Sequence, residues 1–173
     1  MGVDAPRRKR DTAHRPAEAR VGRPEPDVTQ TREMDMAQSE LHDLRVLVVE
    51  DESLVAMLVE DTLYDLDCTV VAVASNLSDA LDKASSMDFD VAILDVNLNG
   101  SPAFPIAERL LRRKIPFIFS TGYGLAGVPE AFSRVPVLAK PFRQGDVGRA
   151  LKAAIKSHAA ARQREAAARP EGS

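Results

Sequence analysis

The hydrophobic residues in the middle of the chain follow two alternating patterns. Five short apolar runs rich in β-branched residues begin 20 to 25 residues apart, and each has the length of one buried strand. Between the runs, apolar residues recur every three or four positions, which places them on one face of a helix. The predicted strands are Arg45–Val49, Thr69–Ala74, Val91–Leu94, Pro116–Ser120 and Pro136–Ala139.

Helical periodicity predicts four helices, at Val55–Leu66, Leu77–Ala84, Ala107–Leu111 and Val147–Ile155. The connection Leu125–Arg134 is short, follows a glycine-rich turn and has the weakest helical pattern. Strands that alternate with helices predict an α/β protein with a parallel sheet covered on both faces. Right-handed crossovers leave few topologies, and we expect a flavodoxin-like (βα)5 doubly wound sheet with strand order 2-1-3-4-5.

Composition divides the chain into three parts. Residues 1–43 hold four of the eleven prolines, no aromatic residue and a single leucine, and are predicted to be a disordered N-terminal tail. Residues 44–158 carry the strand and helix pattern and form the predicted domain. Residues 159–173 are rich in alanine and are predicted to extend the last helix and end in a tail. Met34 and Met36 stand just before the domain and are alternative start positions.

Overall composition and charge exclude several classes of protein. With 45% hydrophobic and 28% charged residues, a net charge of −3 and no apolar run as long as a membrane span, we expect no membrane partner and no direct nucleic-acid partner. The basic cluster Arg7–Arg10 is diluted by nearby acidic residues and is predicted to be a solvated charge run. A single cysteine, Cys68, excludes a disulfide framework and suits a reducing compartment, which predicts a cytoplasmic location.

Polar residues follow four of the five predicted strands directly. Glu50 and Asp51 follow the first strand, Asp95 the third, Thr121 the fourth and Lys140 the fifth. In a doubly wound sheet the carboxyl ends of the strands share one edge, where ligands bind. Three carboxylates this close repel one another unless a cation intervenes, and an oxygen-only ligand set favours Mg²⁺. Acylphosphate formation on one aspartate would let the lysine and the threonine hydroxyl contact the phosphate.

Four short motifs in these places resemble the receiver domain of two-component response regulators. They are VLVVEDE (46–52), AILDVNLNG (92–100), FIFSTGYG (117–124) and VLAKPF (137–142), and the resemblance covers about residues 44–158. The string FSTGYG is similar to the motif of a group of stand-alone receivers with the pattern Phe-Ala-Thr-Gly-hydrophobic-Gly. Proteins of that group have no output domain and typically pair with histidine kinases of the HWE and related types.

The resemblance assigns a role to each strand-end residue. It makes Asp95 the acceptor of a phosphoryl group from a kinase phosphohistidine. It makes Glu50, Asp51 and Asp95 ligands of Mg²⁺, together with the backbone carbonyl of Asn97. It makes Thr121 the switch hydroxyl.

The same resemblance makes Lys140 the phosphate partner, and Gly122 leaves room for the phosphate. Asn97 and Tyr123 stand where side chains tune hydrolysis of the acylphosphate. Kinase docking is expected on the segments 52–66 and 142–144, where Phe142 is a candidate anchor.

Three residues depart from the usual receiver pattern. Ser120 stands where the narrower group has alanine. Val137 stands where most receivers have an aromatic residue that swings inward on activation. The narrower group also tends to lack this aromatic residue. Glu50 replaces an aspartate, which is a conservative change for a metal ligand.

Two functions remain open on the sequence. The first is a single-domain response regulator that accepts phosphate on Asp95 from a histidine kinase or a histidine phosphotransfer protein, and acts by protein interaction or as a relay or sink. Such a protein is not an enzyme, although it assists its own phosphorylation and dephosphorylation. The second is a protein-interaction module that works without phosphorylation, which the valine at position 137 favours. The sequence leaves open whether the chain forms a homodimer.

Overall fold

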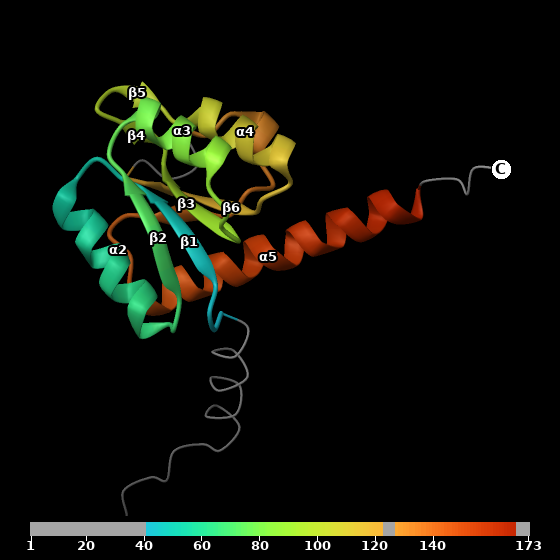
Figure 1. Ribbon diagram of the computed structural model, residues 1–173, viewed down its shortest axis with the longest axis horizontal. Helices are drawn as coiled ribbons and strands as arrows, with labels where there is room; N and C mark the ends of the chain where they lie inside the picture. Colours follow the sequence, from blue (N-terminus) through green and yellow to red (C-terminus); the bar gives the residue numbers. More distant parts are fainter. Residues whose placement is uncertain (1–40, 123–126, 169–173) are drawn as a thin grey trace, which may run out of the picture.

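A five-stranded parallel sheet forms the centre of the computed structural model, which describes residues 41–122 and 127–168. The strands lie in the order β2-β1-β3-β6-β7 and every adjacent pair is parallel (Figure 1). Counted along the chain, these are strands 2-1-3-4-5, so the predicted flavodoxin-like order is confirmed. The strands are β1 (Arg45–Val49), β2 (Thr69–Ala74), β3 (Val91–Asp95), β6 (Phe117–Thr121) and β7 (Val137–Ala139).

Two layers of helices cover the sheet, one on each face. The helices α3 (Leu77–Ser86) and α4 (Phe104–Arg113) contribute to one buried cluster, and α2 (Ser53–Asp65) and α5 (Gln144–Ala167) contribute to the other. Figure 1 shows the same division, with α3 and α4 together above the sheet. Both faces of the sheet are therefore buried, which explains why the strands read as continuous apolar runs.

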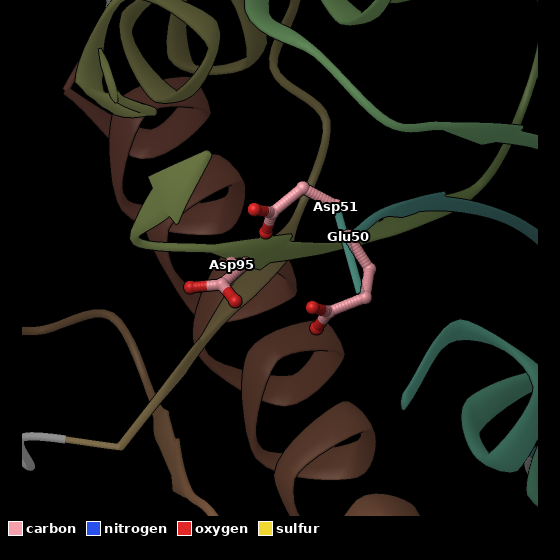
Figure 2. A group of neighbouring side chains, drawn as sticks. All are labelled: Glu50, Asp51 and Asp95. Atoms are coloured by element: carbon pink, nitrogen blue, oxygen red, sulfur yellow. The ribbon is translucent and has the colours of Figure 1, made fainter. Parts of the chain in front are cut away.

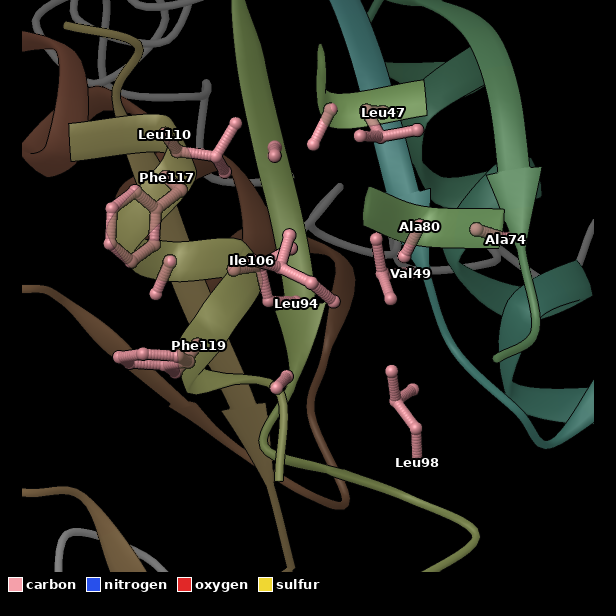
Figure 3. Close-up of a cluster of buried hydrophobic side chains, with 14 of the residues drawn as sticks. Leu47, Val49, Ala74, Ala80, Leu94, Leu98, Ile106, Leu110, Phe117 and Phe119 are labelled. Carbon is pink, nitrogen blue, oxygen red and sulfur yellow. The ribbon is translucent and has the colours of Figure 1, made fainter. Parts of the chain in front are cut away.

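Alternation along each strand supplies the two cores. In β1, Leu47 and Val49 pack with the α3–α4 layer, and Val46 and Val48 pack with the α2–α5 layer. Successive side chains of a strand point to opposite faces, so one strand serves both layers. Figure 3 shows the α3–α4 core, where side chains from the sheet meet Ala80 of α3 and others from α4.

The connection between β6 and β7 differs from the predicted helical crossover. Within residues 127–136 the only regular element is the short 3₁₀ helix η2 (Glu130–Phe132). Phe132 is buried and anchors this connection, stacking 5.8 Å from Phe104 and meeting Phe119 edge-on at 5.6 Å between ring centroids. Aromatic packing, rather than a helix, thus fastens this connection to the sheet.

A small hairpin after β3 was not predicted. Its strands β4 (Asn97–Leu98) and β5 (Ser101–Pro102) pair antiparallel across a two-residue turn. Asn99 and Gly100 both have positive φ, 51° and 86°, as a type I′ turn requires. The dipeptide Asn-Gly is a strong local sequence signal for this turn.

The packed part of the chain begins earlier than predicted. Leu41 is completely buried in the α2–α5 core, and the backbone N–H of Asp43 donates to the carbonyl of Asp67 at 2.9 Å. Leu41 therefore belongs to the domain and not to the predicted tail. Cys68 is buried, as expected of an inert thiol, and burial raises its pKa to about 11.

At the other end, α5 continues without a break beyond residue 158 as far as Ala167. No helix in the described ranges has both the length and the apolar character needed to cross a membrane. The cluster Arg7–Arg10 and the residues Met34 and Met36 lie outside the described residues.

Candidate phosphoryl-acceptor and metal site

Four strands bring the predicted site residues to one edge of the sheet. Glu50 and Asp51 directly follow β1, Asp95 ends β3, Thr121 ends β6 and Lys140 directly follows β7. Figure 2 shows the three carboxylates converging at the carboxyl end of the sheet. The parallel order explains this convergence, because β1 and β3 are neighbours, as are β3 and β6, and β6 and β7.

Lys140 joins two of the carboxylates. Its Nζ lies 2.7 Å from Oε2 of Glu50 and 2.6 Å from Oδ2 of Asp95. Glu50 is 3% exposed, and the lysine side chain is 17% exposed, so these pairs are largely shielded from water. Shielded charge pairs interact strongly, and one ammonium here holds two carboxylates in place.

Backbone donors orient the remaining carboxylate oxygens. The N–H of Asn97 donates to Oδ1 of Asp95 at 3.0 Å, and the N–H of Asn99 donates to Oδ2 of Asp51 at 3.0 Å. The N–H of Glu52, at the start of α2, donates to Oε1 of Glu50 at 3.2 Å. Each carboxylate is thus positioned by the loop that follows its own or a neighbouring strand.

The three carboxylates form a cluster suited to a hard cation. One oxygen from each of Glu50, Asp51 and Asp95 lies within 4.8 Å of the others. Three negative charges against the single positive charge of Lys140 leave an excess that a divalent cation would neutralise. Oxygen donors in this number fit Mg²⁺, which keeps several of its waters.

Burial perturbs the protonation of this group. Burial raises the pKa of Glu50, and the nearby charge of Asp95 raises it further, against the opposing effect of Lys140. For Lys140, burial alone would lower the pKa, but the hydrogen bonds and charges of Asp95 and Glu50 prevail and raise it. Lys140 is therefore firmly protonated, whereas burial and the charge of Asp95 make the ionised form of Glu50 less favourable.

An open cavity of about 600 Å³ gives access to these groups. Asp51, Asp95, Thr121 and Lys140 all line it. A Cβ added at Gly122 would meet nothing within 4 Å, so this side of the cavity has space. The cavity therefore leaves Asp95 and Lys140 accessible from solvent.

The sequence also matches a known protein family. Residues 46–152, more than half of the chain, match the model of the response regulator receiver domain. The chain belongs to the response regulator receiver family. The predicted resemblance to receiver domains is thus confirmed, as is the fold predicted from the strand and helix pattern.

Two curated proteins and one solved structure illustrate the relationship. The receiver is 33% identical over 117 residues to the sensory transduction protein LytT of Bacillus subtilis, covering 63% of this chain and 47% of LytT. It is 33% identical over 130 residues to the phyllosphere-induced regulator PhyR of Methylorubrum extorquens, covering 70% of this chain and 47% of PhyR. The chain thus spans about half the length of both relatives.

The solution structure of SdrG from Sphingomonas melonis Fr1 is similar over most of its length. It is 43% identical to this receiver with a TM-score of 0.61, and the match covers 65% of this chain and 97% of SdrG. These comparisons identify a receiver domain of a response regulator.

Two features of this receiver site were not predicted. Asn99 positions Asp51 through its backbone N–H, a contact that the Asn-Gly hairpin signal could have suggested. Ser120 is 1% exposed, and its Oγ has no hydrogen-bond partner in the described structure. Ser120 pairs in register with Asp95 on β3, so the two residues are neighbours at the end of the sheet.

Other predicted residues have mixed outcomes. Val137 is half-buried in β7 and packs with the α3–α4 core, so no aromatic side chain occupies this position. Phe142 is half-buried against the α2–α5 core rather than free as an anchor. Asn97 is exposed in β4 beside the site. Tyr123 lies outside the described residues.

Proposed function

We propose that this protein is a single-domain response regulator that accepts a phosphoryl group on Asp95 in two-component or phosphorelay signalling. The observation that carries the proposal is the contact of Lys140 Nζ with Oδ2 of Asp95, inside a cluster of three carboxylates at the open edge of the sheet. A carboxylate beside a shielded ammonium and a metal-binding cluster is suited to form and hold an acylphosphate.

The transfer step follows from this arrangement. An oxygen of Asp95 forms a bond to phosphorus as the bond from phosphorus to the imidazole nitrogen of a kinase phosphohistidine breaks. The electron pair stays on the imidazole, which takes up a proton from solvent. Lys140 is then free to pair with a phosphate oxygen, because the carboxylate charge that it neutralised is gone.

Glu50, Asp51 and Asp95, with the backbone carbonyl of Asn97, are the proposed Mg²⁺ ligands. The bound cation would neutralise charge on the cluster and on the transferred group. The excess of carboxylates over cationic side chains in the described site supports this assignment.

Thr121 is the proposed switch residue. Its side chain is buried at the end of β6 and lines the same cavity as Asp95. A hydroxyl there can donate to a phosphate oxygen, which would draw the end of β6 toward the acceptor. Val137, on the neighbouring strand β7, is not an aromatic residue that could move together with Thr121. We therefore infer that the conformational change on phosphorylation is confined to the end of β6.

A histidine kinase, of the HWE type suggested by the resemblance, or a histidine phosphotransfer protein is the proposed partner. The helix α2 begins beside the site and carries exposed apolar side chains at helical spacing: Leu54 is 81% exposed, Met57 59% and Leu58 51%. Exposed apolar side chains on one helical stripe suit contact with another helix. The cytoplasmic location, the absence of nucleic-acid binding and the non-enzymatic character remain parts of this proposal.

The experiment is intact-mass measurement after incubation with Mg²⁺ and acetyl phosphate. We expect one added phosphoryl group on the wild-type protein and none on Asp95→Asn or in the presence of EDTA. Asp82→Asn is the matched control, because Asp82 is an exposed carboxylate on α3 far from the site in the fold. Equal labelling of Asp95→Asn and the wild type would refute the proposal.

A protein-interaction module that works without phosphorylation is the second candidate, favoured by the half-buried valine at position 137. It predicts no phosphoryl addition from acetyl phosphate or from a phosphorylated kinase. It also predicts equal partner affinity for the wild type and Asp95→Asn.

A further inference from the structure

A second cavity lies at the opposite edge of the sheet from the receiver site. It is a groove of about 670 Å³ between the end of α4, the starts of β6 and β7, and the second half of α5. A smaller hollow of about 220 Å³ continues it, and the two share Leu111, Ile115, His158 and Ala161. The strands enter the sheet here, so the groove is remote from their carboxyl ends, where Asp95 lies.

The floor of this groove is apolar. Ile115, Pro116, Val135 and Pro136 line it and are only half-buried, and Leu111 is 52% exposed at its edge. These side chains come from three separate elements, so the patch is continuous across the fold and not confined to one helix. Contiguous apolar surface of this kind marks a binding site more often than scattered apolar residues do.

One wall of the groove is the second half of α5, which is only sparsely packed. No residue of α5 after Ala154 is buried, and Figure 1 shows this half of the helix running out past the sheet and α4. Thirteen residues at the ordinary helical rise make a projection of about 20 Å. An exposed helix of this length draws little stability from its own hydrogen bonds, so a partner lying against it would stabilise it.

The rim of the groove and of its continuation is strongly basic. Arg134 and Arg164 line the groove, and Lys114 and Arg162 line the continuation. Glu165 is the one carboxylate among the described lining residues, and Lys114 Nζ already binds it at 2.7 Å. The remaining arginines therefore present uncompensated positive charge to an occupant.

His158 adds no reliable charge to this rim. Burial lowers its pKa, and the nearby Arg162 lowers it further. Because His158 is then neutral, the positive charge at this rim comes from the arginines, which stay charged at any physiological pH.

We propose that this groove, defined by Leu111, Ile115, Arg134, Val135, Ala161 and Arg164, binds an acidic amphipathic helix of a partner protein. The apolar stripe of such a helix would cover the floor, and its carboxylates would face Arg134 and Arg164. This surface is a second interaction site, separate from the phosphoryl site and from the exposed stripe on α2, and it extends the function proposed above.

Two other occupants fit less well. A second copy packed groove to groove would bring a second basic α5 against the first, because Lys152, Lys156, Arg162 and Arg164 all lie on that helix. Nucleic acid would satisfy the arginines but would leave the apolar floor uncovered. An acidic helix with an apolar face matches both the rim and the floor.

The test is selection of 16-residue peptides from a random display library on the full-length protein, followed by fluorescence-anisotropy titration of the enriched sequences. We expect enriched peptides with apolar residues spaced three and four apart and an excess of Asp and Glu. Their affinity should fall roughly tenfold or more for Arg134→Glu/Arg164→Glu. Arg109→Glu/Arg112→Glu is the matched control, since both arginines are exposed on α4 and neither lines the groove; this pair should leave the affinity within about twofold.

Several results would overturn the inference. Enrichment of no peptide, or of basic or neutral peptides only, would exclude an acidic partner. Equal weakening by the two arginine pairs would show charge attraction without a defined groove. Displacement of the peptide by an unrelated oligonucleotide at matched concentration would favour nucleic acid. Phosphoryl addition to Asp95, measured by intact mass on the same variants, should be unchanged, so failure of this site and failure of the phosphoryl site are separately visible.

Discussion

The two ends of the same parallel sheet have opposite characters. At the carboxyl end, side chains from three strands meet within hydrogen-bond distance, with Lys140 between Glu50 and Asp95. At the amino end, the described lining residues of the groove and its continuation are mostly apolar or basic, and the ion pair of Lys114 with Glu165 lies at the surface. The comparison shows that charged side chains gather at the carboxyl end of the sheet, where neighbouring strands bring Lys140 beside two carboxylates. At the amino end, the described side chains form an apolar surface with a basic rim.

Removal of the central cation gives the largest expected effect on this comparison. Lys140→Met leaves Glu50 and Asp95 buried without their ammonium partner, and we expect a loss of about 3 kcal/mol in the free energy of unfolding at pH 7 without Mg²⁺. Phosphoryl retention should fall with it. Urea denaturation measures the first, and the decay of the phosphorylated mass measures the second.

Arg134→Met is the matched change at the other end of the sheet. Arg134 is exposed, and no ion pair is seen for it in the described structure, so stability and phosphoryl retention should both stay at wild-type values. Equal losses for the two variants would erase the distinction between the two ends.

Metal binding gives the next effect. At a Mg²⁺ concentration one hundred times its dissociation constant, the wild type should gain about 2.7 kcal/mol in the free energy of unfolding. Glu50→Gln should lose most of that gain, because one carboxylate ligand is missing. Thermal unfolding with and without Mg²⁺ measures both.

Without metal, the sign of the Glu50→Gln effect reverses. The pKa of Glu50 is raised in the folded state, so its contribution to stability is fully present below the unfolded pKa and is lost as pH rises through the folded pKa. We therefore expect metal-free Glu50→Gln to be more stable than the wild type at pH 7, with the difference vanishing toward pH 4. A less stable variant at pH 7 would contradict the charge account of this site.

The smallest expected effect concerns the unpartnered Ser120 hydroxyl on the strand next to Asp95. Ser120→Ala removes a buried Oγ that has no hydrogen-bond partner among the described residues, so the variant should gain about 1 kcal/mol in stability. Ser78→Ala, an exposed serine on α3, should change stability by less than about 0.5 kcal/mol. If Ser120→Ala instead destabilises the protein, the hydroxyl has a partner such as a bound water.

The sheet was predictable because its signals are local and repeated. Each strand of the sheet is an apolar run, and right-handed crossovers then leave few topologies, of which the flavodoxin-like order is the common one for five strands. The convergence of Glu50, Asp95 and Lys140 follows from that order, since parallel strands share their carboxyl ends.

Other features depend on contacts between residues far apart in the sequence, which the pattern of hydrophobic residues does not reveal. The η2 segment is held by Phe132 against Phe104 and Phe119, and ring packing between distant residues leaves no period in the sequence. Leu41 looks like part of a polar tail until the α2–α5 core that surrounds it is known. The groove is lined by the end of α4, the segments before β6 and β7, and the second half of α5, so no single segment indicates it.

The most direct test of the central claim is to locate the phosphoryl group on the chain. After incubation with Mg²⁺ and acetyl phosphate, reduction with borohydride converts a phosphorylated aspartate to homoserine, and peptide mass spectrometry then identifies the residue. The account predicts homoserine at position 95 and unmodified Glu50 and Asp51. Conversion at Asp51 or elsewhere, with Asp95 intact, would contradict it.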